Sequence, residues 1–304
     1  MDKKLIMSYK IYDCFMYYDE DLLLDFRLNY LSPYVHKFVI VEANYSHSGK
    51  KRKFHFNINK YLKFKDKIIY IPIYEKPKKL NLILKEDSVR AKDKKFIVNG
   101  YLRENFQRNQ IKLGLNEAED EDIIIISDLD EIPKIEDLDF NKIKEKIIIF
   151  KQFFLFYKFN LFYKKRHWYG PRACRKKYLI NPQWLRDIKI KKYSIFRPDI
   201  FFSRKKYNSI FIVKSGGWHF TNLKNPKKIH DKFSNYLHHR EFEYSNIKTK
   251  DIKSMIKNKI SLYNHEVDKS ENKFDGTVKL YKLSNKYLPK YIVKNISKYK
   301  VWFD

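Results

Sequence analysis

The sequence predicts an α/β protein built around a mostly parallel sheet that helices cover on both faces. Short aliphatic runs recur through the first half, and amphipathic segments separate them. These runs are apolar throughout rather than alternating, which is typical of strands buried on both sides. The chain has only seven glycines among 304 residues and contains neither a GxGxxG nor a GxxxxGK[ST] motif. Nucleotide binding through those two motifs is therefore not indicated.

The first half is expected to contain five strands and two helices. The predicted strands are the aliphatic runs Lys10–Tyr17, Phe38–Val41, Ile68–Ile71, Ile123–Ile126 and Ile147–Phe150. The first predicted helix is Asp21–Leu31, with Leu24, Leu28 and Leu31 on one face. The second is Asn99–Leu113, with Leu102, Phe106 and Leu113 on one face and Gly100 and Gly114 as its boundaries.

The second half is denser in aromatic and basic residues. We expect strands at Ile200–Ser203 and Ser209–Val213, then a helix from Lys228 to Arg240 that buries Ile229, Phe233, Tyr236 and Leu237. The run Phe153–Tyr163, with Trp168 and Tyr169, is expected to be mostly core, although such rings could also stack on a sugar. No linker rich in Gly, Ser or Pro separates the halves, so residues 1–304 are predicted to form one domain with parts 1–150 and 151–304.

The net charge of +29 leaves two interpretations open. It could serve a polyanionic partner, either nucleic acid or an anionic membrane surface. It could also be compositional, because Lys is spread almost evenly and no dense basic block stands out. Cys14 and Cys174 are too few and too far apart for a zinc site or a disulfide framework, which suits a reducing compartment. We expect neither a signal peptide nor a transmembrane helix.

The stretch Ile123–Pro133, IIIISDLDEIP, carries the clearest chemical signal. Ligands of open α/β sheets bind beyond the carboxyl ends of the strands, which is where Asp128 and Asp130 fall. In extended backbone these two carboxylates point to the same side and could hold a hard divalent cation. The alternative is a solvated acidic turn, where Asp is common in any case.

Four further stretches join this motif in a specific pattern that covers nearly the whole chain. They are Phe26–Lys50 (FRLNYLSPYVHKFVIVEANYSHSGK), Tyr101–Leu115 (YLRENFQRNQIKLGL), Gly216–Thr221 (GGWHFT) and Lys273–Asn295 (KFDGTVKLYKLSNKYLPKYIVKN). With DIIIISDLDEIP they resemble glycosyltransferase family 17, which includes the enzyme that adds the bisecting β-1,4-linked N-acetylglucosamine to N-glycans. The chain resembles the soluble bacterial or viral members, because it lacks the anchor and stem of the animal enzymes.

The resemblance implies a GT-A-type fold, inversion at the anomeric carbon, a sugar-nucleotide donor such as UDP-N-acetylglucosamine, and Mn²⁺ or Mg²⁺. Residues 1–150 would then bind the nucleotide sugar and residues 151–304 would face the acceptor, a glycan or lipid-linked saccharide. Asp128-Leu129-Asp130 matches the family's DxD-type motif. Asp130 would be the first metal ligand, Asp128 would contact the metal or the donor ribose, and Glu131 would support the reacting groups.

The resemblance also suggests roles for residues outside the motif. Gly216 and Gly217 would let the backbone approach the donor, Trp218 would face its sugar ring, and His219 would bind the metal or the diphosphate, whereas on the bare residues GGWH is a tight turn with a buried Trp. Glu42 could contact the base or ribose, or cap its strand. Arg103 and Arg108 could bind the diphosphate, or form a solvated helix face. The general base is expected among Asp187, Asp199 and Glu241, with Asp187 preferred.

A second class of function uses the same residues differently. A nucleic-acid-binding protein or metal-dependent nuclease would place the carboxylates in a two-metal site and use the positive charge to hold phosphates. Such a protein concentrates its cations in a stripe, whereas Lys is diffuse here, so no nucleic-acid partner is expected. The expected location is cytoplasmic, with peripheral contact to the inner face of the membrane as a hypothesis that rests on charge.

Overall fold

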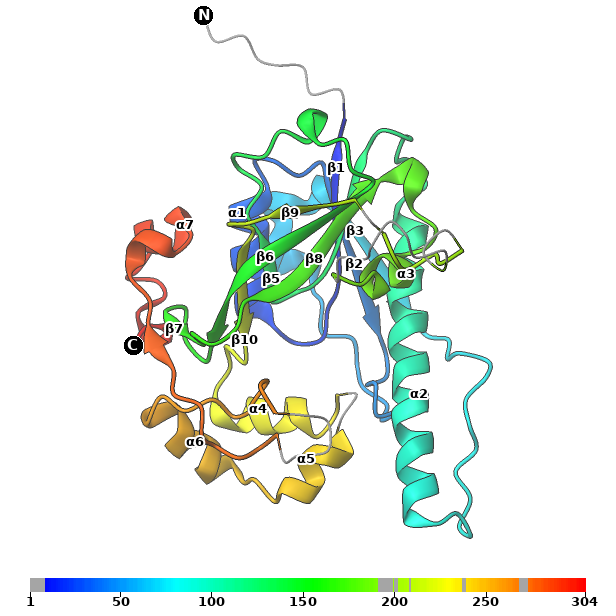
Figure 1. Ribbon diagram of the computed structural model, residues 1–304, viewed down its shortest axis with the longest axis vertical. Coiled ribbons are helices and arrows are strands. Elements are labelled where there is room, and N and C mark those ends of the chain that lie inside the picture. The colour runs from blue at the N-terminus through cyan, green and yellow to red at the C-terminus, as the bar shows by residue number, and fades with distance from the viewer. Residues whose placement is uncertain (1–8, 191–198, 200–201, 208, 237–238, 268–272) are drawn as a thin grey trace, which may run out of the picture.

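The computed structural model describes residues 9–190, 199, 202–207, 209–236, 239–267 and 273–304 (Figure 1). Its first half contains a parallel sheet in the order β3-β2-β1-β4. These strands are β1 (Ile11–Met16), β2 (Lys37–Ala43), β3 (Ile68–Ile73) and β4 (Ile123–Asp128). The α/β class is confirmed, and so are the predicted strands of this half. The aliphatic runs of β1, β2 and β4 are buried on both faces, as their composition indicated, whereas the edge strand β3 is only partly buried.

The second half makes the eleven-stranded sheet mixed rather than mostly parallel. The strand β8 (Trp168–Arg175) lies between β4 and β6 (Ile147–Phe156) and is antiparallel to both. No helix crosses over between β6 and β8, and strands joined without a crossover pair antiparallel. The remaining strands are β5 (Glu131–Pro133), β7 (Leu161–Phe162), β9 (Ile210–Val213), β10 (Gly217–Thr221) and β11 (Tyr281–Lys282). The prediction of a mostly parallel sheet is therefore correct for the first half only.

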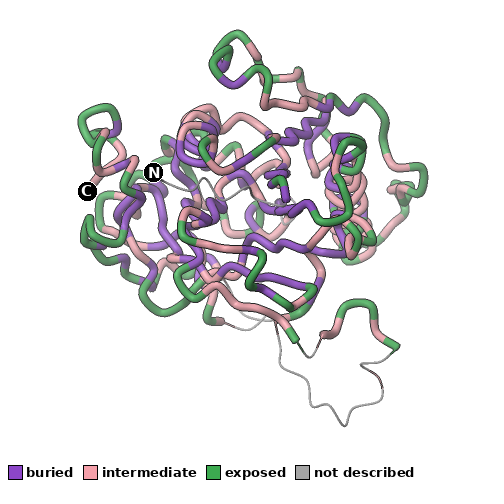
Figure 2. The backbone as a smooth tube through the Cα atoms, turned by 90° about the horizontal axis from the view of Figure 1, so that it is seen from above, coloured by how far each residue is buried: buried purple, intermediate pink, exposed green. Residues whose placement is uncertain are grey.

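Helices cover both faces of this sheet, as predicted. On one face α1 (Asp21–Leu31) buries Leu24, Leu28 and Leu31 completely against alternate residues of β1, β2 and β4. The other face packs against the 3₁₀ turn η2 (Gln110–Gly114) and α3 (Pro182–Asp187). The buried residues are concentrated in these central layers (Figure 2). Cys14 and Cys174 are free and buried in the core.

The second predicted helix is longer at its start and shorter at its end than the sequence indicated. Helix α2 (Val89–Asn109) begins after Ser88, whose hydroxyl accepts a hydrogen bond from the backbone N–H of Ala91. Gly100 lies inside this helix and does not bound it. Leu113, expected on the buried face, is half exposed because the chain tightens into η2 before reaching it. The helical spacing of buried apolar residues therefore ends before Leu113.

A third apolar cluster lies below the sheet and is formed by β6, β7 and three helices (Figure 1). The helices are α4 (Pro226–Phe233), α5 (His239–Ser245) and α6 (Thr249–Lys257). The predicted helix Lys228–Arg240 is thus divided between α4 and α5, with Ile229 and Phe233 buried as expected and Leu237 outside the described residues.

Strand β9 confirms the prediction at Ser209–Val213. The strand predicted at Ile200–Ser203 begins on residues outside the described part, and its described residues 202–203 are not in a strand. The short elements are α7 (Lys290–Lys294), η1 (Ile58–Lys67), η3 (Phe140–Lys142), η4 (Lys176–Tyr178), η6 (Asn285–Tyr287) and η7 (Lys300–Trp302). Among the described residues, no helix is both long enough and apolar enough to cross a membrane.

Candidate active site

A cavity of about 580 Å³ lies at the carboxyl ends of the strands. Residues that directly follow β1 and β2 form one part of its wall, among them Tyr18 and His47. The turn after β4 and the end of β10 form another part. This is the edge of an α/β sheet where ligands bind, and the volume suits a small-molecule ligand.

The turn Asp128–Glu131 is held in place by a fully buried arginine of α1. The Arg27 guanidinium forms a bidentate ion pair with Asp13 of β1, with contacts of 2.6 and 2.8 Å, and also donates to Ser127 Oγ. It further donates to three carbonyl oxygens of the turn, those of Asp128, Leu129 and Glu131. Because a buried guanidinium requires all these acceptors, Arg27 fixes the backbone of the acidic turn to the two central strands.

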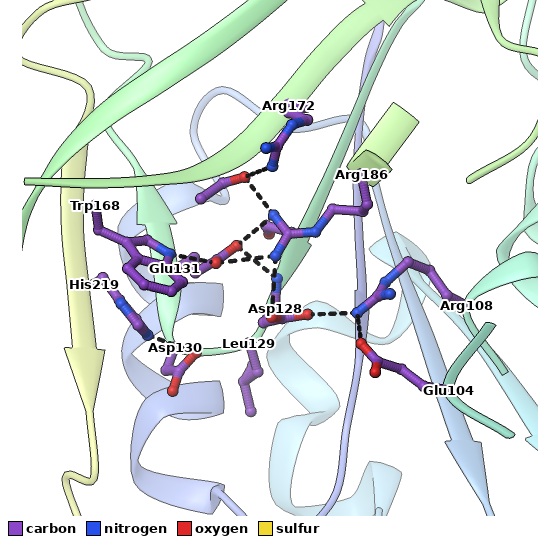
Figure 3. A network of polar contacts seen from close by, with 12 residues as sticks. Glu104, Arg108, Asp128, Leu129, Asp130, Glu131, Trp168, Arg172, Arg186 and His219 are labelled. Carbon is purple, nitrogen blue, oxygen red and sulfur yellow. Dashed lines mark hydrogen bonds and ion pairs between the residues drawn. The ribbon is translucent and has the colours of Figure 1, made fainter. Parts of the chain in front are cut away.

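Asp128 is neutralised by two guanidinium groups (Figure 3). Its Oδ1 lies 3.0 Å from Arg108 of α2, and its Oδ2 lies 3.1 Å from Arg186 of α3. Arg108 also pairs with Glu104 at 2.7 Å. Burial raises the pKa of the Asp128 carboxyl, but the charges of Arg186 and Arg108 outweigh this and hold the pKa below its usual range. Arg108 is therefore engaged with carboxylates, whereas the sequence suggested that it would contact a diphosphate.

Glu131 is fully buried and does not border the cavity. Its carboxylate contacts Arg186 at 2.8 Å and accepts hydrogen bonds from Trp168 Nε1 (2.6 Å) and from the backbone N–H of Asp128 (3.0 Å). Gly170 lies against it so closely that an added Cβ would come within 2.5 Å of the Glu131 carboxyl carbon. These contacts make Glu131 a residue that positions Trp168 and Arg186, and its expected part in supporting the reacting groups stays a prediction.

Asp130 borders the cavity in a looser environment. Its Oδ1 lies 3.4 Å from His219 Nε2, and its Oδ2 lies 3.4 Å from the Lys232 ammonium of α4. Burial raises the pKa of the Asp130 carboxyl, but Lys232 and His219 outweigh this and lower it well below the usual range. The His219 ring stacks on Phe154 with an interplanar angle of 6° and also contacts Trp168. This packing aims Nε2 at the carboxylate.

Asp130 and His219 are the two residues here that could hold a divalent cation, which would also lie near the Lys232 ammonium. Mg²⁺ binds its ligands at about 2.1 Å in octahedral geometry, so two adjacent ligand atoms lie about 3 Å apart. Asp130 Oδ1 and His219 Nε2 are close to that separation. The described residues contain no group of three His, Cys, Asp or Glu side chains that could hold a metal, so phosphate oxygens and water would complete the shell. Asp128 does not join this set, because a cation there would face two guanidinium groups.

Three of the residues predicted around His219 lie away from the cavity. Adjacent residues of a strand point to opposite faces, so His219 faces the cavity while Trp218 enters the core and donates Nε1–H to the Tyr287 carbonyl oxygen at 2.7 Å. Gly217 has φ of +115°, and a Cβ there would lie 2.1 Å from the Ile132 carbonyl oxygen. A Cβ at Gly216 would lie 2.8 Å from Phe150. These glycines allow β10 to approach β5 and β6, and neither they nor Trp218 border the cavity.

Glu42 and Arg103 also have structural partners. The Glu42 carboxylate is fully buried, pairs with Arg52 at 2.8 Å and accepts from the backbone N–H groups of His55 and Phe56. It thus fixes the loop that follows β2, and the strand-terminal cap is the interpretation that the structure supports. Arg103 donates to the His47 carbonyl oxygen at 3.0 Å and packs under Gly49. Neither residue borders the cavity.

The three carboxylates considered as the general base lie outside the cavity. Asp187 ends α3, where it pairs with Lys205 and accepts from Gln183. Asp199 pairs with Lys206 and Glu241 lies 3.5 Å from Lys273. The preference for Asp187 is therefore not supported by its position. Apart from Asp128 and Asp130, the carboxylates that border the cavity are Glu20 and Glu104, which sequence reasoning did not select.

Sequence reasoning also missed Arg186, Lys232 and His265. Lys232 and His265 border the cavity, and Arg186 joins Asp128 to Glu131. One signal was available for this wall, because Glu104 and Arg108 are four residues apart in a predicted helix and such pairs meet on one face. The aromatic run from Phe153 divides between core and site: Phe153 packs against the main core, whereas Phe154 and Phe156 border the cavity beside Trp168.

Comparison with known families places this chain among the glycosyltransferases. It belongs to glycosyltransferase family 17, whose model matches residues 3–303, which is essentially the whole chain. The acidic turn, Arg27, His219 and the three apolar clusters all lie within the matched region. No curated protein and no solved structure matches the chain significantly. The family expected from the sequence is thus confirmed, and with it a general glycosyltransferase activity.

Proposed function

We propose that this glycosyltransferase is metal-dependent, has a GT-A-type fold and transfers N-acetylglucosamine from UDP-N-acetylglucosamine to a hydroxyl group, with inversion. The acceptor would be a glycan or a lipid-linked saccharide. The observation that carries the proposal is the position of Asp130 and His219. They face each other at 3.4 Å in the wall of a 580 Å³ cavity at the carboxyl ends of the strands. A hard cation, a diphosphate and a sugar would meet at such a place.

Asp130 and His219 would hold the cation, Mn²⁺ or Mg²⁺. When bound, the cation supplies Lewis-acid stabilisation of the charge that develops on the leaving diphosphate. Lys232 would add a second positive charge there, because its ammonium already lies 3.4 Å from Asp130. The part of the Asp128 carboxylate that faces the cavity, about 40% of its side chain, would accept a hydrogen bond from a donor hydroxyl such as the ribose.

The two ends of the cavity differ in chemistry, which supports a division between donor and acceptor. Residues from the first 150 supply a polar end, which includes Glu20, His47 and Gln107 and also the aromatic Tyr17, Tyr18 and Tyr45. Later residues supply an aromatic end formed by Phe154, Phe156, Trp168, Tyr263 and His265. Burial, reinforced by the charge of Arg166, lowers the pKa of His265 to about 3, so its ring stays neutral. We place the nucleotide at the polar end and saccharide rings, which stack on aromatic faces, at the other.

The test measures thermal stability with a panel of sugar nucleotides, each with and without Mn²⁺. A ligand at 100 times its Kd stabilises the native state by about 2.7 kcal/mol, which raises the melting temperature. We expect the largest metal-dependent rise with UDP-N-acetylglucosamine, and its loss in Asp130→Ala. Asp187→Ala is the matched control, because it removes a carboxylate that does not border the cavity. If a different sugar nucleotide gives the largest rise in melting temperature, that sugar nucleotide replaces UDP-N-acetylglucosamine as the proposed donor. A rise that does not depend on Mn²⁺ would contradict the proposed metal dependence.

A further inference from the structure

Asn222 directly follows β10 and lies in the wall of the cavity. The residue is only 3% exposed, and its side-chain Oδ1 is buried without a hydrogen-bond partner among the described residues. Buried polar atoms of folded proteins almost always have a partner, so each exception needs a physical reason. For an amide in the wall of a cavity, the simplest reason is that a bound ligand supplies the partner.

The backbone at Asn222 is also unusual. Its φ of +57° lies in the left-handed region, and Tyr157, which directly follows the neighbouring strand β6, has a φ of +61°. The two strands run parallel and pair Thr221 with Phe156, so the two left-handed residues lie side by side. The backbone N–H of Tyr157 donates to the Thr221 carbonyl oxygen at 3.1 Å. Bulky residues rarely adopt this conformation, and residues that do are concentrated at ligand-binding sites.

A left-handed backbone is by itself a sufficient reason for an asparagine, as Asn246 shows. Asn246 follows α5, has a φ of +54°, is exposed and does not border the cavity. Asparagine is a common choice where a helix ends in this way. The conformation does not explain why the Asn222 amide is buried without a partner, because an unpaired buried acceptor costs stability. The two asparagines share a conformation and differ in their surroundings, and that difference points to a ligand.

Asn222 lies where the two ends of the cavity meet. Phe156 of the aromatic end pairs with the residue before Asn222. On the other side, Lys224 donates its backbone N–H to the Asn222 carbonyl oxygen at 2.7 Å, and its ammonium contacts Glu20 of the polar end at 3.0 Å. His219 is three residues back along the chain, about 10 Å at the rise of a strand, so Asn222 stands apart from the proposed cation. With the nucleotide at the polar end, the sugar attached to it would reach this junction.

We propose that Asn222 binds the sugar that the enzyme transfers, through hydrogen bonds of its side-chain amide. This role rests on the proposed function, in which the cavity holds a sugar nucleotide. An asparagine amide offers an acceptor at Oδ1 and two donors at Nδ2. It therefore complements an acetamido group, which presents one N–H and one C=O. A site that pairs with such a group discriminates against donors that lack it.

The experiment measures the Kd of UDP and of UDP-N-acetylglucosamine by calorimetric titration of the full chain in the presence of Mn²⁺. Asn222→Gly removes the amide and keeps the left-handed backbone, which glycine adopts without strain. The Kd of UDP-N-acetylglucosamine should rise about tenfold, the scale of one or two lost hydrogen bonds. The Kd of UDP should not change, because UDP lacks the sugar. Asn246→Gly is the matched control, with the same substitution at the same backbone conformation, and should change neither Kd.

The comparison of the two ligands separates sugar binding from a structural role. Asn222→Gly is expected to fold, because it removes an acceptor that has no partner and strains no backbone. A lower melting temperature with both Kd values unchanged would assign Asn222 a structural role and overturn the proposal. Equal losses for UDP and UDP-N-acetylglucosamine would also overturn it. A wild type that binds neither ligand would instead contradict the proposed function, and the role of Asn222 would fall with it.

Discussion

Asp128 and Asp130 are two residues apart, border the same cavity and have different surroundings. On the Asp128 side, both carboxylate oxygens form ion pairs of about 3 Å with guanidinium groups that also bind Glu104 and Glu131. On the Asp130 side, the carboxylate faces an imidazole and an ammonium group at 3.4 Å, near the limit of a hydrogen bond. Asp128 is held by two guanidinium groups, and Asp130 is held less closely. We propose that the two carboxylates differ in role, with Asp128 mainly stabilising the site and Asp130 mainly binding the cation.

The largest effect is expected from breaking the Asp128 side. Arg186→Met removes the cation that lies 2.8 Å from the buried Glu131. Loss of one partner of a buried ion pair costs about 3–5 kcal/mol of unfolding free energy. Urea unfolding measures the difference. The control is Lys177→Met, which breaks an exposed pair with Glu121 and should cost much less. Equal losses in the two variants would show that the network is not a structural element.

The Asp130 side should respond in activity as well as in stability. Asp130→Asn keeps the size of the side chain but removes the charge that would hold the cation. We expect the rate of sugar transfer to fall by about 100-fold or more, the scale of losing one group that stabilises charge in the transition state. The free energy of unfolding should also fall, because Lys232 and His219, which hold the Asp130 pKa below its usual range, lose their counter-charge. A variant that unfolds readily but retains its turnover would reverse the two roles.

The pH dependence of stability sharpens the comparison. The pKa of Asp128 is lowered in the folded state, so its ionised form contributes stability fully above the ordinary Asp pKa of about 3.9 and loses it as the pH falls through the folded pKa. Among the charges that lower this pKa, Arg186 is the largest. In Arg186→Gln the loss should therefore begin at higher pH. Melting temperatures between about pH 3 and pH 7 measure this, and parallel profiles for both proteins would contradict it.

The smallest expected difference is between two tryptophans. Trp168 donates to Glu131 and borders the cavity, whereas Trp218 donates to the Tyr287 carbonyl oxygen within the core. Replacement of either by Phe should cost about 1–3 kcal/mol, because a buried acceptor loses its partner. Only Trp168→Phe should also raise the KM for the acceptor. Steady-state kinetics of the two variants separates them, and an equal rise in both would indicate a general loss of structure.

Local pattern predicted the strands because each is encoded by a few consecutive apolar residues. Ile123–Ile126 can be recognised as a buried strand because it consists of four isoleucines. Asp128 and Asp130 come shortly after them in the sequence, so they must lie at the carboxyl end of that strand. The start of α2 was missed because residues 89–98 carry many charges and little apolar periodicity. Its sequence signal was the N-cap Ser88. The split between Trp218 and His219 could have been predicted by treating GGWHFT as a strand, since neighbouring residues then face opposite sides.

The pairing of the acidic turn could not be predicted, because its partners come from distant parts of the chain. Arg186 is 55 residues from Glu131 and reaches it only because α3 packs on the second face of the sheet. Arg27 is 101 residues from Asp128. Lys232 approaches Asp130 from α4, in the helical cluster below the sheet. Nothing in the local sequence of these residues marks them as partners of a carboxylate, so an exposed surface role was equally plausible for each.

The most direct test of the contrast is calorimetric titration of the protein with Mn²⁺ and UDP-N-acetylglucosamine, with Asp128→Asn and Asp130→Asn compared under conditions where both are folded. We predict that Asp130→Asn abolishes the Mn²⁺-dependent part of nucleotide binding. Asp128→Asn should melt at a lower temperature, because Arg108 and Arg186 lose their counter-charge, and should keep the Mn²⁺ response. Loss of the Mn²⁺ response in Asp128→Asn, with its retention in Asp130→Asn, would contradict the account.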